Sequence, residues 1–188
     1  LPGVHNVRNA LGALAIAWEL GLDVETASTC LATFEGVGRR FTEVGDIRLG
    51  DARIHAIEDY GHHPTELEAT LDAARGGWPG RRQVVVFQPH RYSRTRDLFD
   101  DFSRVLSDAD VLVLTDVYAA GEAPIEGIDS HALCHSIRVR GKVDPVLVPD
   151  IGDLPDALSS LVRDDDLLLL LGAGSMDSVA RALREQAV

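Results

Sequence analysis

Apolar residues follow two different patterns along this chain, and the change from one to the other divides the sequence. Residues 6–20 are rich in alanine and leucine and predict a helix. A second helix is predicted from Val24 to Phe34, with Asp23 as its N-cap. A glycine-containing stretch then interrupts the helical pattern, so we expect a boundary within residues 40–46.

Beyond this boundary, strand patterns alternate with helix patterns. Residues 42–49 and 52–58 are predicted to be two strands of a hairpin, because Gly50 and Asp51 separate them. Further strands are expected at residues 83–88, 111–115, 144–148 and 167–171. Further helices are expected at residues 64–75, 94–106, 130–138, 154–162 and 175–186.

Three of the later strands are continuous apolar runs rather than alternating ones. They are Val84–Phe87, Val111–Leu114 and Leu167–Leu171. Such runs are typical of strands buried on both faces of a parallel sheet. The pattern therefore predicts an α/β fold: a Rossmann-like, open, mostly parallel sheet with helices on both faces, preceded by a short helical segment. In such folds ligands bind where strands end and helices begin.

Composition and charge narrow the class of protein. The net charge of −12 argues against a nucleic-acid partner. No apolar run approaches the roughly 18 residues that a membrane span needs, and the start lacks a signal-peptide pattern. Cys30 and Cys134 lie in helical patterns without metal-ligand spacing, so we expect two buried, reduced thiols in a cytoplasmic protein. The first residue is not Met and lies near a helical pattern, from which we expect a piece of a longer protein.

Residues 59–66, Asp-Tyr-Gly-His-His-Pro-Thr-Glu, follow the second predicted strand. The Asp59 carboxylate can bind a ribose hydroxyl or a metal-bound water, and the imidazoles can donate to phosphate or carboxylate oxygens. The alternative is that His63 or Thr65 caps the next helix while Asp59 closes a turn. For the cluster as a whole we favour a functional site.

Residues 88–97, Gln-Pro-His-Arg-Tyr-Ser-Arg-Thr-Arg-Asp, form a positive patch after the next strand. Arg91 and Arg94 are three residues apart, so one face of a helix start could present both guanidinium groups to an anion. The helix dipole would add to this attraction. The alternative is a solvated face with ion pairs to nearby aspartates, which we expect for Arg96.

Three further signals are weaker. The segment His5-Asn6-x-x-Asn9 offers side-chain amides for an adenine edge, although Asn6 could simply be an N-cap. Arg40 could reach a nucleotide phosphate or ribose. Residues 172–174, Gly-Ala-Gly, lack the third glycine of the dinucleotide fingerprint, and tight strand-to-helix packing explains them about as well. The sequence holds no phosphate loop, nucleophile elbow or zinc spacing.

These motifs, in this order, resemble those of the Mur ligase family over essentially the whole chain. The resemblance is carried by His5-Asn6-x-x-Asn9-Ala10, Gly38-Arg39-Arg40-Phe41, residues 59–66, residues 88–97, Tyr118-x-x-Gly121-Glu122-x-Pro124 and Gly172-Ala173-Gly174. The second cluster and the Tyr118 motif resemble the branch of the family that joins L-alanine to UDP-N-acetylmuramate.

The resemblance implies a three-domain, ATP- and Mg²⁺-dependent enzyme of peptidoglycan precursor synthesis. Residues 1–44 would be the tail of the central ATP-binding domain, and residues 45–188 would be the C-terminal domain. The N-terminal and central domains of the same protein would be partners of this part, and the metal ligands would lie mainly in the central domain. Alone, the chain would be inactive, because it lacks the phosphate loop.

The motif match also implies roles for individual residues. Those that would face ATP are His5, Asn6, Asn9, Arg40 and Asp59. Those that would bind L-alanine or the acyl phosphate are Tyr60, His63, Arg91 and Arg94, with His62 and His90 as the catalytic groups. Two alternatives stay open: the sister ligase that attaches a preformed tripeptide to the same sugar, and a nucleotide-binding module without catalytic activity.

Overall fold

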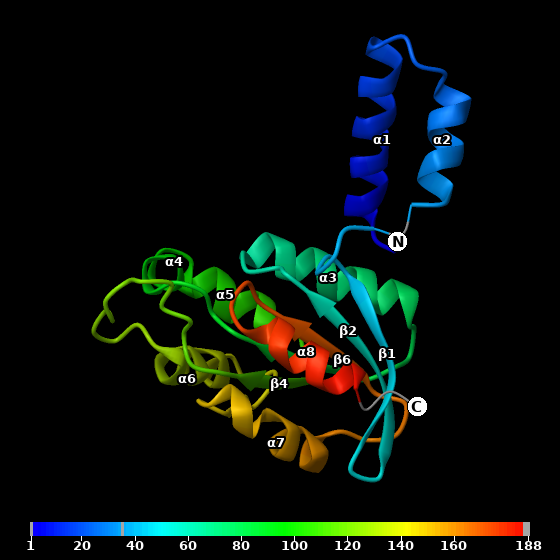
Figure 1. Cartoon of the computed structure of the whole chain (residues 1–188). Helices are drawn as coiled ribbons and strands as arrows, with labels where there is room; N and C mark the ends of the chain where they lie inside the picture. Colours follow the sequence, from blue (N-terminus) through cyan, green and yellow to red (C-terminus); the bar gives the residue numbers. More distant parts are fainter. Residues whose placement is uncertain (1, 35, 186–188) are drawn as a thin grey trace.

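A computed structural model describes residues 2–34 and 36–185 (Figure 1). The helices are α1 (Val4–Glu19), α2 (Val24–Ala32), α3 (Pro64–Gly77), α4 (Tyr92–Asp97), α5 (Phe99–Leu106), α6 (Ser130–Arg140), α7 (Leu154–Leu161) and α8 (Met176–Arg184). The strands are β1 (Thr42–Leu49), β2 (Ala52–Asp59), β3 (Gln83–Phe87), β4 (Val111–Leu114), β5 (Val146–Leu147) and β6 (Leu167–Leu171). A short 3₁₀ helix, Ile151–Asp153, leads into α7.

The strands form one sheet in the order β1-β2-β6-β3-β4-β5. β1 and β2 are the antiparallel hairpin that Gly50 and Asp51 predicted, and the other neighbours pair in parallel. Strand β6, the last in the chain, lies between β2 and β3 and is buried throughout. The predicted α/β fold with an open, mostly parallel sheet is confirmed.

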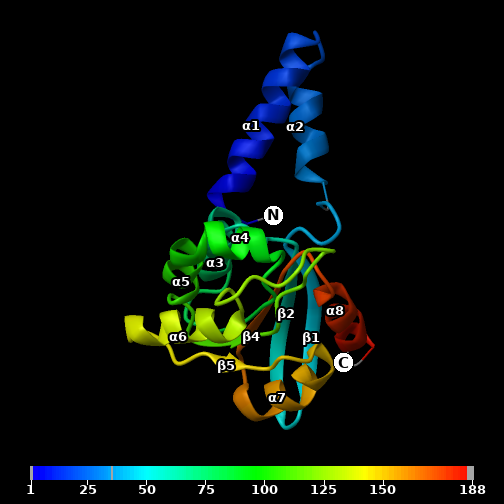
Figure 2. The same ribbon diagram turned by 90° about the vertical axis from the view of Figure 1, so that its left-hand side faces the viewer.

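Each face of the sheet is covered by its own group of helices, which is why the central strands are apolar on both sides. On one face Val85 and Phe87 pack with Phe102 of α5, together with side chains of α3 and α6. On the other face Val84 and Val86 pack with side chains of α7 and α8. In Figure 2 the strands separate the two groups. Because a residue and its neighbour point to opposite faces, one continuous apolar run serves both cores.

Helices α1 and α2 stand apart from this layered domain as a helical hairpin (Figures 1 and 2). Their only buried side chain is Ala17 of α1, and α1 touches the rest of the chain at α3. Large apolar side chains of the hairpin are exposed, among them Leu11, Ile16 and Trp18. No helix within the described residues is long and apolar enough to cross a membrane.

Two helix predictions are wrong in detail. The helix expected at residues 94–106 is two helices, because Leu98 leaves the helical region with φ −120° and ψ 23°. Asn6 is not an N-cap: the first helix begins at Val4, and Asn6 lies in its first turn. Its amide instead donates to the carbonyl of Pro2 at 2.7 Å. The last helix was expected to reach residue 186, which lies outside the described residues.

The two cysteines differ from each other, and the expectation that both are buried is wrong for Cys30. Cys134 of α6 is buried in the core. Cys30 lies on α2, where it is exposed, because the hairpin has no second layer of structure against that side.

The expectation of Asp23 as the cap of α2 is confirmed, since its carboxylate accepts a hydrogen bond from the amide of Thr26.

Candidate functional site

The ends of three neighbouring parallel strands bring the predicted clusters together. Across the sheet, Asp59 of β2 lies opposite Leu171 of β6, and Leu171 lies opposite Phe87 of β3. The loops that begin at residues 60, 88 and 172 therefore leave the sheet at the same level. Both clusters predicted from the sequence, 59–66 and 88–97, start at this edge, in keeping with the rule for open α/β sheets.

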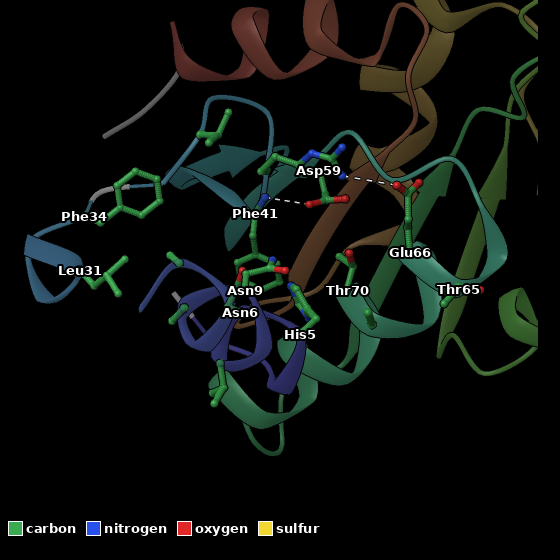
Figure 3. A pocket seen from close by; sticks show the side chains of 16 residues that line it. His5, Asn6, Asn9, Leu31, Phe34, Phe41, Asp59, Thr65, Glu66 and Thr70 are labelled. Atoms are coloured by element: carbon green, nitrogen blue, oxygen red, sulfur yellow. Dashed lines mark hydrogen bonds and ion pairs between the residues drawn. The ribbon is translucent and has the colours of Figure 1, made fainter. Parts of the chain in front are cut away.

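A pocket of about 880 Å³ lies between the helical hairpin, the linker that follows it and the start of α3 (Figure 3). Its lining includes all five residues predicted to face ATP: His5, Asn6, Asn9, Arg40 and Asp59. Leu31, Phe34 and Phe41 supply apolar surface. Apolar surface with a few polar groups is typical of small-molecule binding pockets.

Two backbone amides hold the carboxylate of Asp59, which lines this pocket. One carboxylate oxygen accepts a hydrogen bond from the amide of Phe41 at 2.8 Å, and the other accepts from the amide of Gly61 at 2.7 Å. Burial raises the pKa of the Asp59 carboxyl, against the opposing effect of these amides. Gly61 is needed here, because a Cβ on it would lie 2.7 Å from the Asp59 carboxylate.

Two consecutive arginines in the linker have different surroundings. Arg39 points inward: its Nε lies 3.2 Å from the buried carboxylate of Glu58, and it donates to the carbonyl of Gly172. Arg40 is half-exposed at the pocket and makes an ion pair of 3.5 Å with Glu66. Of the two, Arg40 is the one that lines the pocket.

A second group of side chains is aromatic and begins at Tyr60, directly after Asp59. The Tyr60 and His62 rings meet edge to face with centroids 5.2 Å apart, and the His62 and His90 rings are 5.7 Å apart. His90 in turn stacks on Tyr118 at 5.4 Å. Four rings from three loops thus form one row, which joins the two clusters that the sequence predicted separately.

His90 is held by Arg94, one turn along α4. Nη1 of Arg94 lies 3.2 Å from Nδ1 of His90 and also donates to its carbonyl oxygen at 3.2 Å. Burial, followed by the positive charges of Arg94 and His62, lowers the pKa of His90. Because a guanidinium only donates, Nδ1 is the acceptor and Nε2 of the neutral ring carries the proton. His90 therefore presents a hydrogen-bond donor.

The start of α4 is occupied by a carboxylate of the protein itself. The amide and hydroxyl of Ser93 donate to Glu122, and the guanidinium of Arg91 lies 3.8 Å from it. Glu122 thus satisfies the amide and hydroxyl of Ser93 at this helix start, and the binding of an external anion by Arg91 and Arg94 stays a prediction. Among the described residues no carboxylate pairs with Arg94, whereas Arg96 pairs with Asp97 at 2.8 Å, as predicted.

His63 is the N-cap of α3, which is the alternative that the sequence left open. Its ring accepts from the amide of Thr65 at 3.4 Å, and Glu66 accepts from the amide of His63 at 3.1 Å. The two together form a capping box. Glu66 also accepts from the amide of His62 at 2.9 Å. A substrate-binding role of the exposed His63 stays a prediction.

The described residues contain no group of three or more His, Cys, Asp or Glu side chains that could hold a metal ion. Asp59 was a candidate, but backbone amides engage both of its oxygens. This part of the chain therefore does not fit a Mg²⁺ site by itself, since Mg²⁺ favours several free oxygen ligands.

Four residues that shape the site carried no predicted role. They are Arg39, Glu66, Tyr118 and Glu122. Glu66 could have been found from the capping-box spacing, three residues after His63. The partners of the other three are far away in the sequence, so no local pattern shows them.

Comparison with known proteins gives a consistent set of relatives. Residues 39–174 match the family described as "Mur ligase, glutamate ligase domain". The UDP-N-acetylmuramate–L-alanine ligase of Bordetella parapertussis is 54% identical over 191 residues, which cover 100% of this chain and 41% of that protein. The corresponding protein of Bordetella petrii is 53% identical, with the same coverage. The chain thus spans about two fifths of the length of these curated relatives.

Solved structures agree with this result. The UDP-N-acetylmuramate-alanine ligase MurC from Thermotoga maritima has a TM-score of 0.77 and 30% identity, and the match covers 98% of this chain and 38% of that one. A murein peptide ligase from Psychrobacter arcticus has a TM-score of 0.67 at 22% identity, covering 99% of this chain and 37% of that one. At that identity the second likeness shows a shared fold.

Proposed function

This chain belongs to the Mur ligase family, and on that premise we propose that it forms the amino-acid-binding part of a ligase that joins L-alanine to UDP-N-acetylmuramate. The observation that carries the proposal is the junction of the two strand-end clusters: the His62 ring lies 5.7 Å from the His90 ring, which Arg94 holds at 3.2 Å. The amide of His62 donates to Glu66, which lines the pocket together with Asp59 and Arg40. A site for an amino acid beside a site for a nucleotide is what ATP-driven amide formation requires.

In the proposed reaction, a carboxylate oxygen of UDP-N-acetylmuramate attacks the γ-phosphorus of ATP, and ADP leaves. The alanine nitrogen then attacks the carbon of the acyl phosphate, and inorganic phosphate leaves after the amine has lost its proton. Such chemistry depends mainly on positioning and on neutralising charge. Arg94 would hold the alanine carboxylate, and the Nε2–H group of His90 would donate a hydrogen bond to the oxyanion that develops. His62 would orient the amine from the adjacent loop.

ATP would lie in the pocket of Figure 3, with its adenine near Asn6 and Asn9 and its phosphates towards Arg40. The exposed position of Arg40 supports this arrangement, because its charge is only weakly neutralised by Glu66 at 3.5 Å. Mg²⁺ would be held by ligands outside this chain and would neutralise phosphate charge. A UDP-sugar and ATP as substrates would place the enzyme in the cytoplasm.

Residues 1–44 would belong to the central domain of the longer protein, and residues 45–188 would form its C-terminal domain. The change from the helical hairpin to the sheet at Thr42 and the exposed apolar residues of α1 and α2 support this division. Those apolar side chains would pack against the rest of the central domain. The chain alone would not form the amide, because its sequence has no phosphate loop.

The test is made on the full-length protein. We expect phosphate release that depends on ATP, UDP-N-acetylmuramate and L-alanine, with little release when the tripeptide replaces L-alanine. The Arg94→Ala variant should raise the KM for L-alanine at least about tenfold, because a charged hydrogen bond is lost. Arg96→Ala is the matched control on the same helix, since Arg96 pairs with Asp97 at the surface.

Three results would oppose the proposal or a part of it. Activity with the tripeptide alone would assign the protein to the sister ligase instead. Sub-micromolar ATP binding by the 188-residue chain in calorimetry would favour a nucleotide-binding module that works without the phosphate loop. An Arg94→Ala variant that behaves like Arg96→Ala would remove the assigned role of Arg94.

A further inference from the structure

The loop that follows β4 carries the motif Tyr118-x-x-Gly121-Glu122-x-Pro124, to which the proposed function gives no task. This loop lies alongside the loop that carries His90 and Arg91. The amide of Tyr118 donates to the carbonyl of Pro89 at 2.8 Å, and the amide of Arg91 donates to the carbonyl of Tyr118 at 2.8 Å. These two backbone hydrogen bonds therefore hold the loop that carries His90 and Arg91 against the loop that follows β4.

Arg91 has a backbone conformation that needs such support. Its φ is 72°, in the left-handed region that residues with a Cβ seldom adopt. It is the N-cap of α4, but its side chain makes no capping hydrogen bond. The conformation persists only if neighbouring groups hold the helix start in place.

Glu122 is the group that does so. Its Oε2 accepts from the amide of Ser93 at 2.9 Å, and its Oε1 accepts from the hydroxyl of Ser93 at 2.7 Å. Oε1 also lies 3.8 Å from Nη1 of Arg91. A carboxylate from a loop far away in the sequence thus caps α4 and pairs with the arginine that opens it.

We propose that Glu122 is a positioning residue that holds Arg91 and the start of α4 in the conformation that binds the carboxylate of the amino-acid substrate. The inference rests on the proposed function. Glu122 acts through Arg91 and through the orientation of α4, on which Arg94 stands. It does not touch the substrate, because both of its oxygens are engaged by Ser93.

The charge of Glu122 fits this role. A free carboxylate near the site would repel the carboxylate of an amino acid, but here Arg91 and the α4 amide neutralise it. The two hydrogen bonds from Ser93 lower the pKa of Glu122, so the group stays ionised near neutral pH. Glutamine in its place would keep an acceptor for Ser93 but lose the charge that Arg91 faces.

The experiment compares three variants of the full-length protein: Glu122→Gln, Glu122→Ala and Glu126→Gln. Glu126 lies on the same loop, is exposed and makes no hydrogen bond or ion pair within the described residues, so it is the matched control. We expect Glu122→Ala to raise the KM for L-alanine about tenfold, with a turnover number and a KM for ATP within about threefold of the unmodified protein. Glu122→Gln should raise the KM for L-alanine about threefold.

A loss that is only structural would lower the amount of active enzyme and would leave the KM for L-alanine unchanged. A rise in the KM for L-alanine with an unchanged turnover number therefore tests positioning. If the Ala variant does not fold, the isosteric Gln variant gives the answer. The inference is overturned if both Glu122 variants match Glu126→Gln, or if the turnover number falls while the KM for L-alanine stays constant. Failure of the proposed function would look different, since the unmodified protein would then form no amide from L-alanine.

Discussion

The side-chain carboxamide of Gln88 is bound in the turn that precedes α8, against Ser175. Oε1 of Gln88 accepts from the Ser175 amide at 2.8 Å, and Nε2 donates to the Ser175 hydroxyl at 3.2 Å. The glycines at 172 and 174 leave room for this contact. The Gly-x-Gly turn thus binds a side chain of its own sheet rather than an external anion, which supports the packing interpretation of its glycines.

A methyl group at position 174 should therefore disrupt the edge of the sheet. A Cβ there would collide with Oε1 of Gln88 and would lie 2.8 Å from Cγ of Tyr118. We expect Gly174→Ala to lower the free energy of unfolding by about 1–3 kcal/mol. Gly76→Ala, in α3 with nothing within 4 Å, should leave it unchanged or slightly higher. Urea unfolding of the chain measures both, and equal midpoints would contradict the packing interpretation.

Substitution of the two linker arginines, Arg39 and Arg40, should change the free energy of unfolding by different amounts. Arg39→Ala should lower the free energy of unfolding by about 2 kcal/mol, because Glu58 is only 3% exposed and would keep only the contact with Arg184. Arg40→Ala should change stability by less than about 0.5 kcal/mol, since its pair with Glu66 is half-exposed. Thermal unfolding tests this contrast. A similar loss in both variants would mean that Arg40 is also structural.

His90 should make the chain less stable in mildly acidic solution. Burial, Arg94 and His62 lower its pKa from the ordinary 6.5, so the unfolded chain takes up a proton before the folded chain does. Its contribution to stability is therefore fully present above pH 6.5 and falls as the pH drops below that value. Stability curves between about pH 7.5 and about pH 5.5 should be flatter for His90→Gln than for the unmodified chain.

The exposed His135 of α6 provides the control for this prediction. His135→Gln controls for the removal of an imidazole at an exposed position. Titration of the imidazole signals by NMR gives a direct check, because the signal that disappears in His90→Gln belongs to His90. A midpoint at or above pH 6.5 for that signal would contradict the surroundings described here.

The two thiols should react at very different rates. Burial raises the pKa of Cys134 to about 11, and its side chain lies in the core, so it should not react with iodoacetamide until the chain unfolds. Cys30 is exposed on α2 and should react readily. Mass spectrometry should therefore find one label on the folded chain and two in denaturant. Removal of the fast label by Cys30→Ser is the control, and rapid labelling of Cys134 would mean that α6 opens easily.

Much of the fold could be predicted because its signals are local. The five leucines Leu167–Leu171 predicted a buried strand, and that strand lies at the centre of the sheet. Gly50 and Asp51 predicted the hairpin turn, and Asp23 predicted the start of a helix. Each of these depends on backbone preferences or on an apolar period within a few residues. The break at Leu98 was not predicted, because residues 94–106 are helical in pattern without interruption.

The candidate site was predictable in its residue types but not in its pairings. The sequence identified His62, His90 and Arg94 from their position after strands, and the structure brings them together. It could not show that Glu122 would occupy the start of α4 or that Gln88 would fill the glycine turn. Those contacts join segments 29 and 87 residues apart.

By itself, then, the sequence determined an open α/β sheet, the two clusters at its carboxyl edge and the resemblance that pointed to the family. Only the tertiary structure decided which charged side chains pair with other groups of the protein and which line the pocket. Arg39 and Arg40 are adjacent in sequence, yet one pairs with buried Glu58 and the other faces the pocket. The reason is physical: a side chain's hydrogen-bond and charge partners depend on strand order and loop packing, which no local pattern of residues encodes.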